Sequence, residues 1–283
     1  MITKQQIIEI GEVLCSIGFE NGFFQNEFKL ILADYDRCGF CAEGMPEITI
    51  VVKEALLSPP LKSNNTIFYQ SMEYDSIDAT LLFDTKRFKG EIGVAIKRGD
   101  KFTIVRISEL IETFICNAYI FYFFLNGIGT FIHSCGIADG EKGYVFTGPS
   151  EEGKSTIAKL SYPKTVLSDE LVLLRKSNNG RKKVYGTPFN GKLEGINRGV
   201  DCKGIYFIEK NNTNEIIPIS RMSAVVALMK EGVTGGFMSI DGIQRICTAP
   251  GYLSLLTELL EGVPRYKMRF TRDSSFWEAI DGK

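Results

Sequence analysis

The spacing of apolar and polar positions divides the chain into two halves. In the first half, short β-prone runs are separated by polar turns, which predicts several short antiparallel strands. These runs cover residues 28–32, 47–52, 66–69, 79–83, 93–97 and 102–105, whereas 7–17 fits either a short helix or a strand. We therefore expect a smaller α+β domain over residues 1–107, which contains no motif that indicates a reaction.

The second half begins with the most apolar helical pattern of the chain. Residues 108–125 are apolar on most sides, which predicts a buried helix with Ser108 as its N-cap. Strands are expected at 130–134, 144–147, 165–167, 171–175, 184–185 and 266–270, and helices at 156–160, 221–230, 251–260 and 274–280. The runs 204–209 and 215–219 flank a polar turn and predict a β-hairpin. We therefore expect an α/β domain over residues 108–283.

One stretch of the second half carries a recognisable chemical motif. After the strand 144–147, the residues Gly148 and Gly153-Lys154-Ser155 fit the phosphate-binding P-loop pattern G-x-x-x-x-G-K-[ST]. Glycines let successive backbone N–H groups face a phosphate, and the following helix adds the positive end of its dipole. The nucleotide is expected to contact Gly148, Pro149, Ser150, Glu151, Glu152, Gly153, Lys154, Ser155 and Thr156. The alternative is an ordinary strand–turn–helix.

Within this loop, the residue types suggest separate tasks. Lys154 can reach the β- and γ-phosphates, and the Ser155 hydroxyl can bind Mg²⁺. Glu151 and Glu152 would repel phosphate unless their carboxylates point to solvent or bind the metal or the substrate.

Two acids and the single histidine are the candidates for chemistry beside the loop. Asp169 and Glu170 follow the predicted strand 165–167, where a carboxylate can bind Mg²⁺ or accept the proton of an attacking hydroxyl. The alternative for either acid is a cap or turn role. His133 lies in an apolar strand, where a lone histidine is usually a hydrogen-bonded core residue.

Composition narrows the classes of function. The 283 residues are 44% hydrophobic and 24% charged, as in a soluble globular protein, and 33 basic and 34 acidic residues give a net charge of −1. We therefore expect no nucleic-acid partner. The start lacks a signal-peptide pattern, and the longest apolar stretch, 114–125, is too short for a bilayer core of about 30 Å, so no membrane partner is expected.

The cysteines point to a reducing compartment. The chain has seven, an odd number, which predicts reduced thiols and a cytoplasmic location. Cys38 and Cys41 form a C-x-x-C, but a zinc site would need a second pair, so a turn with two packed thiols is favoured over metal or redox use.

Residues 131–210 resemble the HPr kinase/phosphorylase family and its kinase-only relatives, which are related to the ATP-dependent phosphoenolpyruvate carboxykinases. The resemblance rests on 132–134, 148–156, 167–170 and 186–191, and the run 263–270 is similar to the kinase-only relatives. It implies an HPr kinase/PEP carboxykinase-like P-loop domain that binds ATP and Mg²⁺. It covers the second half only.

The resemblance also implies a role for each matching residue. Lys154 and Ser155 would hold the phosphates and the metal, Asp169 would be the general base with Glu170 as a metal ligand, and His133 would support the base. Which acid is the base stays open, and Asp169 is also a candidate metal ligand. The sequence departs from the family at Glu151, where a glycine is usual, and at Glu170, where an aspartate is usual. The extended motif that the bifunctional enzymes use for phosphate-driven dephosphorylation is not found, and the first half does not resemble that of the HPr enzymes. HPr is therefore not predicted as the substrate, nor is phosphorylase activity.

The expected function is that of a transferase: a cytoplasmic, ATP- and Mg²⁺-dependent kinase. Its acceptor would be a serine-type hydroxyl of a peptide or small protein, for example a ribosomal peptide precursor, bound with the help of the first half. One alternative is a kinase of a small molecule such as free serine. Another is a non-catalytic nucleotide-binding regulatory module, suggested by the acidic loop. Homo-oligomer formation, ATP versus GTP and reversal by phosphate stay open.

Overall fold

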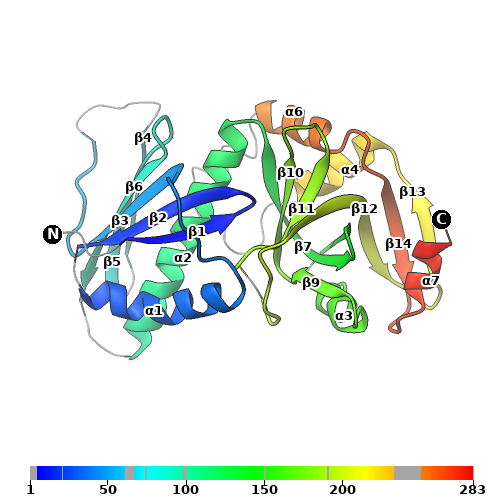
Figure 1. The fold of residues 1–283 in the computed structure, drawn as a ribbon, viewed down its shortest axis with the longest axis horizontal. Helices are drawn as coiled ribbons and strands as arrows, with labels where there is room; N and C mark the ends of the chain where they lie inside the picture. The colour runs from blue at the N-terminus through cyan, green and yellow to red at the C-terminus, as the bar shows by residue number, and fades with distance from the viewer. Residues whose placement is uncertain are drawn as a thin grey trace. The chain divides into compact units, whose positions relative to one another are not determined.

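The chain folds into a mixed α+β structure whose described residues contain two mixed β-sheets, as the sequence predicts at this coarse level (Figure 1). The computed structural model describes residues 5–20, 22–60, 67–73, 75–97, 101–149, 151–189, 191–232 and 250–282. It divides into two compact units, Met1–Leu125 and Asn126–Lys283.

The first unit is built on a six-stranded sheet with the order β1-β2-β3-β6-β5-β4. The strands are β1 (Gln6–Ile10), β2 (Val13–Phe19), β3 (Ile48–Lys53), β4 (Ile67–Glu73), β5 (Ile77–Asp84) and β6 (Lys89–Ile96). The antiparallel expectation is right for β1–β2, β4–β5 and β5–β6, and wrong for the parallel pairs β2–β3 and β3–β6. Helix α1 (Gly22–Arg37) connects β2 to β3, and a helical crossover makes neighbouring strands parallel.

Two predicted strands of this unit are helical instead. Residues 28–32 lie in α1, and 102–105 lie in α2 (Lys101–Leu125). The helical period of α1 is visible in the side chains it buries, because these recur every three or four positions. They are Phe24, Phe28, Leu32 and Tyr35. Ser108 is therefore inside α2 and does not cap it, contrary to the expectation.

Helix α2 is longer than the apolar stretch that the sequence suggests. By length and composition, Ile107–Leu125 could cross a membrane, which corrects the expectation that the stretch is too short. Two-thirds of this segment (67%) is buried inside the structure, and the core helix of a soluble protein passes the same test. The Tyr119 hydroxyl lies 3.1 Å from the carbonyl oxygens of Ile8 and Val13, so hydrogen bonds connect α2 to the β1–β2 hairpin.

The division between the units differs from the expected boundary after residue 107. It falls after Leu125, at the end of α2, because this helix packs against α1, β3, β5 and β6 of the first unit. The predicted helix 108–125 is present, but it supplies core to the first unit.

The second unit is built on an eight-stranded sheet with the order β11-β10-β7-β8-β12-β14-β13, with β9 paired to β7. The strands are β7 (Gly129–Asp139), β8 (Lys142–Thr147), β9 (Thr165–Ser168), β10 (Leu171–Lys176), β11 (Lys182–Tyr185), β12 (Gly199–Lys210), β13 (Glu215–Pro218) and β14 (Arg265–Phe270). Strands β8, β12 and β14 are mutually parallel neighbours, so their C-terminal ends share one edge of the sheet.

The predicted hairpin of 204–209 with 215–219 is wrong, because β14 lies between β12 and β13. Basic residues of β14 face acidic residues of the strands on both sides. Arg269 contacts Glu209 at 3.3 Å and Glu215 at 2.8 Å, and Lys267 contacts Glu209 at 2.7 Å. Such cross-strand charge pairs stabilise the order β12-β14-β13.

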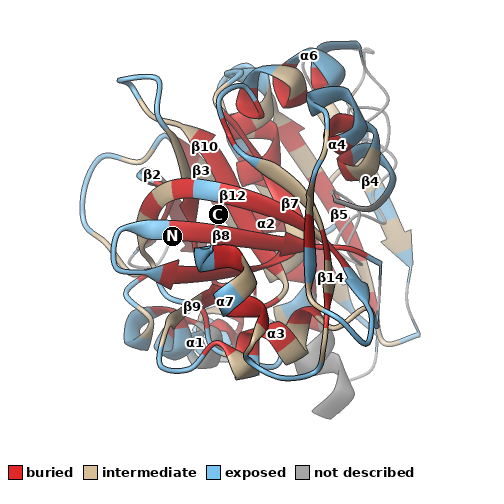
Figure 2. Cartoon of the chain, turned by 90° about the vertical axis from the view of Figure 1, so that its right-hand side faces the viewer, coloured by how far each residue is buried: buried red, intermediate tan, exposed pale blue. Residues whose placement is uncertain are grey.

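Helices cover both faces of the second sheet (Figure 2). On one face, α3 (Lys154–Leu160) and α7 (Phe276–Asp281) pack on an aromatic core that includes Tyr144, Phe146, Tyr206, Phe270 and Trp277. The other face carries α4 (Arg221–Ala227), the π-helix η1 (Leu228–Gly232) and α6 (Pro250–Leu259). The helices predicted at 221–230, 251–260 and 274–280 are thus confirmed. The buried residues gather on β7, β8 and β12, which support the motif loop.

Candidate functional site

The predicted P-loop connects β8 to α3, in the expected order of strand, loop and helix. Its two motif glycines lie where a larger side chain would meet close neighbours. A Cβ at Gly148 would lie 3.0 Å from Ile208, and one at Gly153 would lie 2.8 Å from the ring of Phe270. Gly153 also has a φ of 110°, which favours glycine, and as N-cap it brings no side chain to the first turn of α3. Ser150 lies outside the described residues.

Lys154 is folded over the loop that precedes it. Only 7% of the residue is exposed, and its ammonium donates to the carbonyl oxygens of Gly148 at 2.8 Å and Pro149 at 3.1 Å. A phosphate bound in the loop would accept some of the hydrogen bonds that the Lys154 ammonium donates to these two carbonyl oxygens. The flexible lysine side chain lets the ammonium move between the two kinds of acceptor. Ser155 and Thr156 follow in the first turn of α3 and are partly exposed.

The two loop glutamates are held by Lys210, at the end of β12. The carboxylate of Glu152 accepts the Lys210 backbone N–H at 3.1 Å, and the Lys210 ammonium donates to the carbonyl oxygen of Glu151. Both loop glutamates are therefore bound to the end of β12, Glu152 through its carboxylate and Glu151 through its carbonyl oxygen. Glu151 is exposed and has a φ of 69°, in the left-handed region.

His133 and Glu170 meet beside the end of the P-loop strand. The imidazole Nε2 lies 3.1 Å from Glu170 Oε1, with 16% and 31% of the two side chains exposed. The Thr147 hydroxyl, at the end of β8, donates to the carbonyl oxygen of His133 at 3.1 Å. The hydrogen bond from His133 lowers the pKa of Glu170 against the opposing effect of burial, and the charges of His133 and Lys154 lower it further. The pair and the P-loop lysine are thus electrostatically coupled.

Asp169 is occupied by backbone hydrogen bonds. The residue is 1% exposed, its Oδ1 accepts the N–H of Gly191 at 2.9 Å, and its Oδ2 accepts those of Lys192 at 2.9 Å and Leu193 at 3.1 Å. A Cβ at Gly191 would lie 3.2 Å from Glu170 Oε2 and 3.3 Å from Asp169 Oδ2, so glycine lets this loop pass close to both acids. Asp169 therefore anchors the loop and has less freedom than Glu170 to meet a ligand.

The metal site expected from the sequence has no preformed cage. Within the described ranges, no group of three or more His, Cys, Asp and Glu side chains is arranged to hold an ion. Mg²⁺ commonly uses one or two protein ligands together with phosphate oxygens and water. The Ser155 hydroxyl and the Glu170 carboxylate fit this mode, whereas both Asp169 oxygens already accept N–H groups.

A polar hollow beside the P-loop was missed by the sequence reasoning. It has a volume of about 590 Å³ and is lined by Lys210, Asn211, Asn212, Thr271 and Arg272. These residues follow β12 and β14, which pair Lys210 with Phe270. No local pattern reveals the hollow, because the two segments are about 60 residues apart in the sequence and meet only through the insertion of β14.

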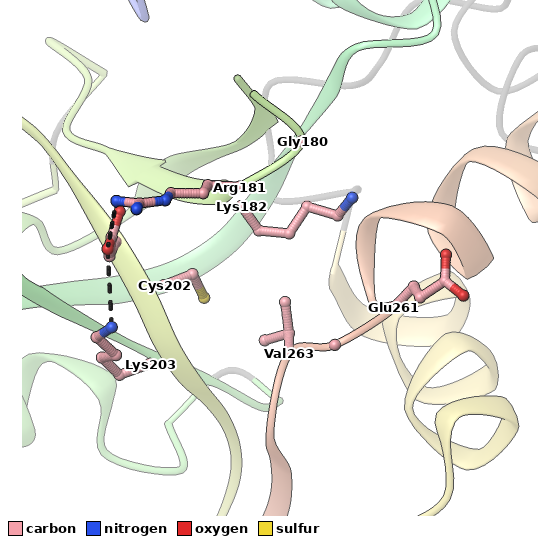
Figure 3. Close-up of a pocket in the computed structure, with 9 residues that line it drawn as sticks. Gly180, Arg181, Lys182, Cys202, Lys203, Glu261 and Val263 are labelled. Carbon is pink, nitrogen blue, oxygen red and sulfur yellow. Dashed lines mark ion pairs between the residues drawn. The ribbon is translucent and has the colours of Figure 1, made fainter. Parts of the chain in front are cut away.

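A second hollow lies at the opposite end of β12 (Figure 3). Its volume is about 460 Å³, and Arg181 and Lys203 each form an ion pair with Asp201, at 3.9 Å and 3.7 Å. Asp201 pairs with Lys142 at the start of β8, whereas the P-loop follows the end of that strand. This hollow is therefore separate from the candidate site.

The C-x-x-C motif belongs to the first unit. The Cys41 thiol donates to the carbonyl oxygen of Leu32 at 3.8 Å, and burial, with a smaller contribution from Asp36, raises its pKa. A thiol with a raised pKa is a weak nucleophile, which agrees with a structural role. The cysteines in the described part of the chain are all free thiols.

Comparison with known proteins assigns no family to this geometry. No protein-family model matches the chain, and a search of curated proteins finds no match. A function is therefore argued from the P-loop, His133 and Glu170.

Proposed function

We propose that the chain is an ATP- and Mg²⁺-dependent kinase that phosphorylates a serine-type hydroxyl of a peptide or small protein. The observation that carries the proposal is the His133–Glu170 pair, hydrogen-bonded at 3.1 Å beside the end of the P-loop strand. A phosphate cradle next to a proton acceptor is the minimal set for phosphoryl transfer, which depends mainly on positioning and charge neutralisation.

The residues of the site supply complementary parts of this reaction. Lys154 neutralises charge on the β- and γ-phosphates, and Mg²⁺ held by Ser155, phosphate oxygens and water would neutralise more. The acceptor oxygen forms a bond to the γ-phosphorus while the bond to the bridging oxygen breaks and ADP leaves. The hydroxyl proton passes to Glu170, and His133 orients this carboxylate through its Nε2–H.

The geometry favours roles for the two acids that differ from those the resemblance implies. Three backbone N–H groups occupy both oxygens of Asp169, so we assign it to positioning of the 191–193 loop. Glu170 is 31% exposed, so its carboxylate can meet an acceptor hydroxyl while His133 orients it, and we assign the general base to Glu170.

The proposal includes the finer fold, an HPr kinase/PEP carboxykinase-like P-loop domain over the second unit. Support comes from the order along the chain: a histidine strand, the P-loop strand, and a strand that ends in two acids beside the histidine. The first unit would then help to bind the acceptor, and a cytoplasmic location would supply ATP.

The test is transfer from labelled ATP by the full chain, offered serine-containing peptides in one arm and free serine in another. Lys154→Ala and Glu170→Gln should each lower kcat by about 100-fold or more. Cys38→Ser, in the first unit, should leave it unchanged. Loss of activity in Asp169→Asn with an intact fold, together with full activity in Glu170→Gln, would reverse the assignment of the base.

A non-catalytic nucleotide-binding module is the second candidate. It is favoured by the two glutamates in the P-loop and by the complete backbone bonding of Asp169, which leaves Glu170 as the one acid of the adjacent pair that can accept a proton. Tight ATP binding without transfer to any acceptor in either arm would support this function over the kinase.

A further inference from the structure

The edge of the second sheet that carries the P-loop also carries the polar hollow. Strands β8, β12 and β14 run parallel, with Thr147 beside Phe207 and Lys210 beside Phe270. The P-loop, residues 210–212 and residues 271–272 therefore leave the sheet side by side. Ligands of open α/β sheets bind outside the C-terminal ends of their parallel strands, and this edge is such a place.

The hollow adjoins the P-loop at Lys210. This residue lines the hollow, and its backbone N–H and ammonium also contact Glu152 and Glu151. The ring of Phe270, one residue before Thr271, packs where a Cβ of Gly153 would lie. The hollow and the loop are therefore adjacent through Lys210 and Phe270.

The lining of the hollow has the chemistry of a nucleoside site. It combines two cations, two amides and a hydroxyl, and none of the residues that line it is acidic. The Arg272 guanidinium forms no ion pair in the part of the chain that the structure describes, so its donors and its planar face are available. Asn211 and Asn212 can donate to and accept from a base edge or a ribose hydroxyl. The volume of about 590 Å³ lies within the usual range for small-ligand sites.

The direction of a bound triphosphate follows from the order of the strands. His133 and Glu170 belong to the β7–β10 side of β8, whereas the hollow belongs to the β12–β14 side. A γ-phosphate that faces His133 and Glu170 leaves the rest of the nucleotide on the opposite side of the loop.

We propose that the hollow between Lys210 and Arg272 is the nucleoside subsite of the P-loop, with Arg272 against the base and the two asparagines as its polar contacts. This inference rests on the proposed function, since it requires a triphosphate in the loop. It assigns the part of the chain that distinguishes a nucleotide from an inorganic polyphosphate.

The experiment compares the binding of ATP and inorganic tripolyphosphate to the full chain by calorimetry in the presence of Mg²⁺. Arg272→Ala and Asn212→Ala should each raise the Kd for ATP by about fivefold to tenfold and leave the Kd for tripolyphosphate within about twofold. Lys154→Ala should weaken both ligands. Arg181→Ala removes a matched exposed arginine from the other hollow and should weaken neither (Figure 3).

Different failures have different meanings. If the wild-type chain binds neither ligand, both the proposed function and the proposed nucleoside subsite are wrong. If it binds both ligands equally, or if Arg272→Ala leaves the Kd for ATP unchanged, the nucleoside subsite is wrong, whereas phosphate binding by the loop is still supported. An equal loss for both ligands in Arg272→Ala would make Arg272 a phosphate contact and would also overturn the assignment. Circular dichroism verifies that each variant is folded.

Discussion

Glu151 combines two unfavourable features at one position of the P-loop. Its φ of 69° lies in the left-handed region, which costs a residue with a Cβ roughly 1–2 kcal/mol. Its carboxylate is also exposed in a loop proposed to bind phosphate. Glycine would adopt the same backbone conformation without this cost. Strain of this kind is often found at functional sites.

Replacing this residue should separate the two effects. Glu151→Gly removes the strain and the charge, whereas Glu151→Ala removes the charge alone. Both should lower the Kd for ATP by about twofold to fivefold, because a repulsive carboxylate is lost. Only the glycine variant should gain stability, by at most about 1 kcal/mol, since glycine also has more entropy to lose on folding. Calorimetric titration and urea unfolding measure the two quantities, and weaker ATP binding in both variants would contradict the prediction.

The lowered pKa of Glu170 has a defined consequence for stability against pH. Because the folded pKa lies below the ordinary value of 4.5, the unfolded chain binds more protons in the acid range. The stabilisation from the His133 hydrogen bond is therefore present above pH 4.5 and is lost as the pH falls through the folded pKa. Urea midpoints of the wild type and Glu170→Gln should differ near neutrality and converge in acid. Glu43→Gln, at an exposed position with no ion pair among the described residues, should leave the urea midpoint nearly unchanged across this pH range.

At the scale of elements, the P-loop depends on the aromatic packing of the strand before it. Phe146 is fully buried, with ring centroids 5.2 Å from Tyr206 and 5.7 Å from Trp277. Trp277 in turn donates to the Ser161 hydroxyl at 3.3 Å, immediately after α3. One aromatic layer thus holds both the strand that enters the loop and the helix that leaves it.

Truncation of Phe146 should therefore weaken the whole second unit. Phe146→Ala should lower the free energy of unfolding by about 3–5 kcal/mol, the usual cost of removing a buried phenylalanine ring. The emission of Trp277, the single tryptophan, monitors this unit. Met222→Ala, at a residue that is 58% exposed, should change the free energy by less than about 0.5 kcal/mol. Equal effects of the two substitutions would show that β8 does not depend on this layer.

At the scale of the whole molecule, each unit contains its own sheet and its own helices. The first keeps α2, whose buried side chains include Phe114, Tyr119 and Phe123. A boundary at residue 107 would remove most of this helix from the sheet that it covers. The sequence cannot show this, because an apolar helix between two halves fits the core of either one.

Fragments of the first unit test the boundary. Residues 5–125 should be soluble and should unfold cooperatively in urea, because the sheet keeps its covering helix. Residues 5–107 should lack cooperative unfolding, since the apolar face of the sheet would be exposed to water. Circular dichroism and size-exclusion chromatography report the outcome. Cooperative unfolding of the shorter fragment would place α2 outside the first core.

Local patterns determined much of the second unit. The strand 144–147, the turn at Gly153 and the helix after Lys154 were all predicted, because a P-loop depends on residues that are adjacent in sequence. The same reasoning failed at 28–32, where a short apolar run fits either a strand or the buried face of a helix. The predicted positions of β10, β14 and the final helices agree with the structure, whereas the pairing of β12 was wrong.

The sequence by itself determined which residue types are available beside the loop: a lysine, a serine, two adjacent acids and one histidine. Only the tertiary structure decided which of the two acids is bound by backbone N–H groups and which is partly exposed beside the histidine. Asp169 is bound by the backbone of residues 191–193, and Glu170 meets a histidine 37 positions away in the sequence. The polar hollow likewise exists only because the parallel pairing of β12 with β14 brings the segments that line it together. The physical reason is the same in each case, because contacts between distant segments depend on strand order, which local hydrophobic patterns do not encode.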